Sequence, residues 1–160
     1  MVYLVGESMS KVGISVVHAK GDADCQIVQE ALKSAADCET HVVGEDTDLL
    51  VLLLFHVKEN MSSVYFSSIR AGTTRVWDIQ RTQSHLGSDV CNYILFAHAF
   101  SGCDTTSRTF GIGKQVPLKK IQQGNNLFLS AAKTFLQSSD HDTVAEAGEG
   151  LLARALTVTI

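Results

Sequence analysis

One stretch of this chain, Thr40–His56 (THVVGEDTDLLVLLLFH), constrains the fold more than any other. Its first four residues are mostly β-branched, which predicts a short buried strand. Three acidic residues follow a glycine directly after this strand, and an unbroken apolar run comes next: Glu45, Asp46 and Asp48, then Leu49–Phe55. Ligands bind at the carboxyl ends of strands in open α/β sheets, and like charges so close together favour a cation. The same residues are also typical of an acidic turn that caps the next helix, so both interpretations stay open.

A second acidic pair, Asp22 and Asp24, stands one helix and one strand earlier in the chain. Apolar residues recur every three or four positions from Ala23 to Ala35, which predicts a helix with one buried face. Asp22 suits the N-cap of this helix, and Asp24 lies in the first turn, where the helix dipole favours negative charge. Capping explains this pair without any chemistry. A helix and a returning parallel strand would nevertheless bring both acidic pairs to the same edge of a sheet.

The rest of the chain alternates further strand and helix patterns. Strands are expected at Val2–Val5, Ile14–Val17, Val64–Phe66 and Arg75–Trp77, the last two joined by a turn at Ala71–Gly72. Helices are expected at Asp78–Leu86, Asp89–Phe100, Leu127–Leu136 and Thr143–Leu156. His98 lies in a strongly apolar helix, where a core or groove histidine is more common than a metal ligand. Asp104 follows the same helix closely.

Basic residues gather in the last third of the chain, although the net charge of the whole chain is −4. Five of them lie between Thr105 and Ser139, a segment without Asp or Glu: Arg108, Lys114, Lys119, Lys120 and Lys133. The segment Gly111-Ile112-Gly113-Lys114 matches neither the P-loop nor the dinucleotide-binding fingerprint. It predicts either a plain corner between helices or a turn whose backbone amides hold a phosphate.

Cysteine usage and hydropathy indicate an intracellular protein without a membrane partner. The four cysteines form no CxxC pair and no dense framework, as is typical of reduced thiols. The longest apolar run, Leu49–Phe55, is too short to span a bilayer, and the first residues lack the pattern of a signal peptide.

Three segments carry a resemblance to a known family: GDAD, GEDTDLL and SGCDTTSRTFGIGK. Their order and spacing resemble the motifs of the flap-endonuclease (5′ nuclease) branch of the PIN-like nuclease superfamily. The chain is more similar still to PIN-like proteins of transposon-related or uncharacterised animal genes. The resemblance covers residues 17–121. It implies an α/β fold with three layers, α/β/α, around a mainly parallel sheet, and a helical hairpin at about residues 102–123.

The resemblance also implies metal-dependent hydrolysis of phosphodiesters by two Mg²⁺ or Mn²⁺ ions. Hard cations take several oxygen ligands, which suits clustered aspartates. Carried over to this chain, the catalytic carboxylates are Asp24, Asp46, Asp48 and Asp104, with Asp22 as a further metal ligand. The residues expected to hold nucleic acid, DNA rather than RNA, are Arg108, Gly111, Gly113, Lys114, Lys119 and Lys120. Such an enzyme is expected in the nucleus rather than the cytoplasm.

The chain departs from the family at its N-terminal side. The family places carboxylates on an upstream strand and near a helical arch, whereas Glu7 is the sole acid before Asp22. A truncated PIN-like domain is therefore expected over residues 1–123, followed by a helical extension over residues 124–160. The expected function is structure-selective nuclease activity, or a remnant of it lost through the missing ligands. The alternative is a catalytically inactive nucleic-acid- or protein-binding module derived from a mobile element.

Overall fold

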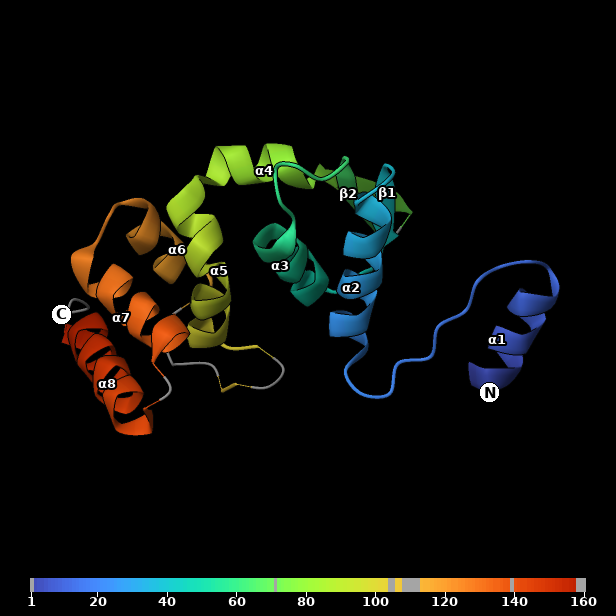
Figure 1. Ribbon diagram of the computed structural model, residues 1–160. Helices are drawn as coiled ribbons and strands as arrows, with labels where there is room; N and C mark the ends of the chain where they lie inside the picture. The colour runs from blue at the N-terminus through green and yellow to red at the C-terminus, as the bar shows by residue number, and fades with distance from the viewer. Residues whose placement is uncertain (1, 71, 104–105, 108–112, 139, 158–160) are drawn as a thin grey trace.

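The computed structural model describes residues 2–70, 72–103, 106–107, 113–138 and 140–157. Within these residues the chain is an α/β protein with eight helices and one three-stranded sheet. In chain order the elements are α1 (Val2–Lys11), α2 (Ala23–Ala35), β1 (Thr40–Val43), α3 (Thr47–His56), β2 (Val64–Arg70), β3 (Thr73–Asp78), α4 (Ile79–Leu86), α5 (Ser88–Ser101), α6 (Gln115–Gln122), α7 (Asn126–Gln137) and α8 (His141–Thr157). Helices α1 and α8 lie at opposite ends of the molecule (Figure 1).

The N-terminal segment differs from the two strands that its sequence predicts. Val2–Val5 is part of helix α1, and Ile14–Val17 has no regular secondary structure. Helix α1 stands apart from the other elements (Figure 1), and Val2 and Leu4 are 72% and 68% exposed. A strand must pair with another strand to satisfy its backbone groups, and none of the described strands pairs with this segment. A helix satisfies these groups internally, so the helical conformation replaces the predicted strand.

The three strands form a mixed sheet in the order β1-β2-β3. Strand β1 pairs with β2 in parallel, with Thr40 opposite Val64, as the sequence leads one to expect. Strand β2 pairs with β3 in antiparallel, with Arg70 opposite Thr73. The described sheet is therefore not mainly parallel. The physical reason is the two-residue connection between β2 and β3, because such a short loop joins only antiparallel neighbours.

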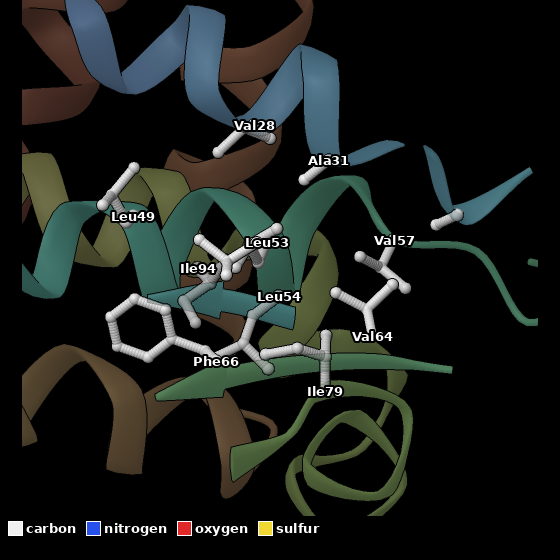
Figure 2. Close-up of a cluster of buried hydrophobic side chains, with 12 residues drawn as sticks. Val28, Ala31, Leu49, Leu53, Leu54, Val57, Val64, Phe66, Ile79 and Ile94 are labelled. Carbon is white, nitrogen blue, oxygen red and sulfur yellow. The ribbon is translucent and has the colours of Figure 1, made fainter. Parts of the chain in front are cut away.

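The main hydrophobic core lies between one face of this sheet and helices α2 and α3. Helix α3 is apolar almost all round because it contacts α2 on one side and α5 on another. Figure 2 shows its central side chain, Leu53, surrounded by residues of neighbouring elements. The buried members of this first cluster are Val28, Ala31, Ala35, Val42, Leu49, Leu53, Leu54, Val57, Val64, Phe66, Ile79 and Ile94.

The opposite face of the sheet carries exposed apolar side chains. Val43, Ile69 and Val76 are 67%, 50% and 57% exposed. Successive strand residues point to opposite faces, so these three belong to the face turned away from α3. The expected third layer is therefore not seen over these side chains among the described residues.

A second hydrophobic cluster joins α5 to the helices that follow it. Gly87, with φ of 85°, ends α4 and immediately precedes α5. Pro117 lies in the first turn of α6, where its missing N–H leaves no helical hydrogen bond unmade. The buried members of this second cluster are Val90, Phe96, Ala97, Ile121, Phe128, Ala131, Ala132 and Leu151, from α5, α6, α7 and α8. The division into domains at residue 123 stays a prediction.

Candidate functional site

The two aspartate pairs occupy equivalent positions at the starts of two neighbouring helices. The Asp22 carboxylate caps α2 by accepting a hydrogen bond from the backbone N–H of Asp24, at 3.0 Å. The Asp46 carboxylate caps α3 in the same way, accepting from the N–H of Asp48 at 2.9 Å. The capping role that the sequence allows is thus confirmed for both pairs. In each pair the second aspartate lies in the first helical turn.

Both helix N-termini lie at the carboxyl end of β1. Helix α2 precedes β1 and packs beside it, and α3 begins only a few residues after β1 ends. Because helix and strand run in opposite directions in such a unit, the start of α2 returns to the edge of the sheet at which α3 begins. The partial positive charge of two helix N-termini is therefore directed to the side of the sheet that carries the aspartates.

The C-terminal end of α5 reaches the same place. The Asp48 Oδ1 atom lies 3.0 Å from Nε2 of His98, and the two side chains are 26% and 12% exposed. Nε2 is buried and makes no aligned hydrogen bond within the described residues, so its contact with Asp48 is a close approach without hydrogen-bond geometry. His98 is nearly buried, as its sequence context predicts. Its contact with an aspartate of the candidate site is a feature that the sequence does not reveal.

Asp104, Arg108 and Gly111 lie outside the described residues. Cys103 and Thr106 are attached to the end of α5. The Thr106 hydroxyl donates to the carbonyl oxygen of Ala99 at 2.8 Å, and the Cys103 N–H donates to the Thr106 hydroxyl oxygen at 3.2 Å. The Ser101 hydroxyl donates to the carbonyl oxygen of His98 at 3.0 Å.

The described part of this site has the ligand type that a hard cation prefers, but too few ligands to bind one. Carboxylate oxygens are what Mg²⁺ and Mn²⁺ prefer. Nevertheless, among the described residues no three His, Cys, Asp or Glu side chains are close enough to hold a metal ion. Asp22, Asp24, Asp46 and Asp48 therefore do not form the expected metal centre on their own.

The described lysines of the candidate nucleic-acid site lie at two separate positions, one before α6 and one in its last turn. Lys114, which directly precedes α6, lines a mostly apolar hollow of about 230 Å³ together with Thr47, His98 and Ser101. Lys114 is thus close to the start of α3, and Gly113 precedes it as a half-buried residue. Lys119 and Lys120 lie in the last turn of α6 and do not line this hollow.

Another hollow, which the sequence does not predict, borders the start of α3. It holds about 380 Å³ and is lined by Glu45, Asp46, Thr47, Leu50, Phe66, Ser68, Arg70, Thr73, Arg75 and Trp77. The Arg70 guanidinium fixes one wall by donating to the carbonyl oxygen of Glu45 at 2.7 Å. The alternation of Arg75 and Trp77 in a strand pattern places both on one face, which is the only signal in the sequence for this hollow.

Comparison of the chain with protein-family models, with curated proteins and with solved structures finds no match. The PIN-like relationship therefore rests on the three sequence segments and stays a prediction. In the part of the chain that the structure describes, no helix is long and apolar enough to cross a membrane.

Proposed function

We propose that this chain is a PIN-like, metal-dependent nuclease domain or the remnant of one. The observation that carries the proposal is the repetition of one arrangement, an aspartate pair at a helix N-terminus, at the same edge of the sheet. Capping and the helix dipole account for one such pair at one helix start, whereas here two pairs stand at the same edge of the sheet. Carboxylates gathered at one edge of a sheet repel one another, and a bound cation would remove this repulsion.

In this proposal each residue type has a separate task. Asp24, Asp46, Asp48 and Asp104 bind the cation, Asp22 lies at the rim, and Lys114 contacts the phosphate backbone. Bound Mg²⁺ or Mn²⁺ would supply an activated water and stabilise the leaving oxygen. The partial positive charges at the starts of α2 and α3 favour anionic groups at this edge, whether carboxylates or a phosphate.

A second candidate function is an inactive module that binds nucleic acid. The observation that favours it is the small number of metal ligands, since the described residues contain no group of three His, Cys, Asp or Glu side chains that could hold a metal. Lysines bind a phosphate backbone through charge alone, and this does not depend on a complete metal centre. DNA is the expected partner in both cases.

The two candidates differ in their response to Mn²⁺. We expect Mn²⁺ to raise the melting temperature of the wild-type protein and to support cleavage of branched or single-stranded DNA. Asp46→Asn should weaken both effects without loss of folding, because Asn caps a helix about as well as Asp. The matched control is Asp89→Asn, since Asp89 is also an exposed aspartate at a helix start but lies at the far end of α5.

Three outcomes separate the possibilities. Equal Mn²⁺ shifts for wild type and Asp46→Asn would contradict a metal site at this edge. DNA binding without any Mn²⁺-dependent cleavage would support the inactive module. In that case Lys114→Ala should weaken binding to all sequences and lower the salt slope of binding by about one unit, the value for one lost phosphate contact. Absence of binding even at low salt would exclude both candidates.

A further inference from the structure

The hollow between the start of α3 and the β2–β3 hairpin is large enough for a small ligand. Its volume is about 380 Å³, and pockets for small molecules hold roughly 300–1,000 Å³. Thr73, Arg75 and Trp77 of β3 line this hollow and are exposed or half-buried, so helix α3 does not cover them. The inner face of β3 is therefore open at this point, and one side of the hollow is a sheet surface.

Two arginines on adjacent strands line this hollow. Arg75 is opposite Ser68, and Arg70 is opposite Thr73, so the two arginines are diagonal neighbours on one face of the hairpin. The guanidinium of Arg70 is held by a carbonyl oxygen and not by a carboxylate. No carboxylate pairs with Arg75 in the described part of the chain. Guanidinium groups with unused donors bind phosphate strongly, often through two parallel hydrogen bonds.

An aromatic surface lies beside these arginines. Trp77 is half-buried and packs against Phe66, with ring centroids 5.7 Å apart. Trp77 and Arg75 are two residues apart on the same strand and therefore share one face. A half-buried tryptophan in an open hollow offers a flat surface on which a nucleobase stacks, a contact worth about 1–3 kcal/mol per base.

We propose that this hollow binds one nucleotide unit, with the base on Trp77 and the phosphate on Arg75 and Arg70. Glu45 and Asp46 also line the hollow. Arg70 is held by the backbone carbonyl oxygen of Glu45, so in the described part of the chain Arg75 is the one of the two arginines without such a contact and the main partner for a phosphate. Ser68 and Thr73 supply hydroxyl groups beside the arginines, since they lie opposite Arg75 and Arg70 in the hairpin. The role of this site in a nuclease rests on the proposed function, because Asp46 would then belong both to the metal centre and to the wall of the hollow. The binding of a nucleotide does not rest on it.

The chain offers a specific reporter for this test, because Trp77 is its single tryptophan. The fluorescence of Trp77 is measured in EDTA during titration with AMP, with adenosine, with inorganic phosphate and with a short single-stranded oligonucleotide. We expect saturable quenching by AMP. Arg75→Ala should weaken this binding by about tenfold, as expected for the loss of one hydrogen bond to a charged group. Arg75 is exposed, so its replacement removes no buried packing.

The control is Arg81→Ala, which removes the same charge from a nearby exposed position in α4 that does not line the hollow. Equal weakening by Arg75→Ala and Arg81→Ala would overturn the proposal, because binding would then depend on overall charge. Competition by inorganic phosphate as strong as that by AMP would also overturn it, since the base would contribute nothing. Tighter binding of the oligonucleotide than of AMP identifies the ligand as a strand, whereas the reverse order identifies it as a free nucleotide.

The outcome is independent of the proposed nuclease. All titrations contain EDTA, so a protein without a metal centre still binds the nucleotide if the hollow is a site. Conversely, the protein could cleave DNA with Mn²⁺ and show no change in Trp77 fluorescence with AMP or the oligonucleotide. That result would support the proposed nuclease function and contradict nucleotide binding in this hollow.

Discussion

At the scale of single residues, Asp46 has two structural roles that the sequence alone does not distinguish. Its carboxylate caps α3, and the same residue lines the hollow that contains Arg75 and Trp77. The neighbouring Asp48 makes no cap but approaches His98 of α5 at 3.0 Å. Asp46 and Asp48 are two residues apart but have different surroundings, because Asp48 contacts α5 through His98, whereas Asp46 lines the hollow.

The capping role of Asp46 predicts a specific order of stability without metal. Asp46→Ala should lower the free energy of unfolding by about 1 kcal/mol, the usual cost of removing an N-cap, because the N–H of Asp48 loses its acceptor. Asp46→Asn should change it by much less, since the amide oxygen still accepts this hydrogen bond. Urea unfolding in EDTA measures both values. Equal losses for Ala and Asn would mean that the negative charge, and not the cap, stabilises the start of α3.

At the scale of elements, most helix starts are set by a side chain that accepts a backbone N–H. Asp78 caps α4 and Asn125 caps α7 in this way. At the start of α8, the Asp140 carboxylate accepts from the backbone N–H of Thr143 at 3.0 Å and also from its hydroxyl. Both hydrogen bonds lower the pKa of Asp140 from its ordinary value of 3.8. The bond from the Thr143 hydroxyl has the larger effect on this pKa, and the bond from the Thr143 backbone N–H has the smaller one.

This lowered pKa predicts how the start of α8 responds to acid. A carboxyl group whose pKa is lower in the folded state stabilises the fold above its unfolded pKa, and this contribution is lost as the pH falls through the folded value. Asp140→Ala should therefore melt at a lower temperature than wild type at pH 7, and the difference should shrink below about pH 3.8. Asp142→Ala is the control, because Asp142 is an exposed aspartate in the first turn of α8. A difference that persists unchanged at low pH would contradict a charged cap.

At the scale of the whole molecule, α5 joins the two hydrophobic clusters. Ile94 belongs to the cluster around α3, whereas Val90 and Phe96 belong to the cluster around α7. Leu86 and Leu118 pack against both clusters. Side chains of one helix thus belong to two hydrophobic cores, so the loss of either core exposes apolar surface of the other.

This shared helix predicts a single cooperative unfolding transition. Trp77 packs against the first cluster and reports on the sheet, whereas far-UV circular dichroism reports mainly on the helices. The two signals should change together with temperature, as in a two-state transition. If the dichroism changed in a separate step, the helices after α5 would form an independent unit.

Local patterns in the sequence determined much of the secondary structure. The strand Thr40–Val43, the helix that begins after Asp22 and the hairpin between β2 and β3 follow from β-branched runs, capping residues and a glycine turn. Such signals act over a few residues, so they are visible without knowledge of the rest of the chain. The apolar run Leu49–Phe55 likewise indicated a buried element, which is helix α3 at the centre of the first core.

Only the tertiary structure decided which of these elements have partners. Val2–Val5 has the composition of a strand but forms part of a helix, because no described strand lies beside it to complete its hydrogen bonds. The contact of His98 with Asp48 and the hollow formed by Asp46, Arg75 and Trp77 join residues that are far apart in the chain. Each depends on the packing of α5 or of the hairpin against α3. Packing is a property of surfaces that meet in space, whereas composition and spacing report only the conformation of a segment and its buried face.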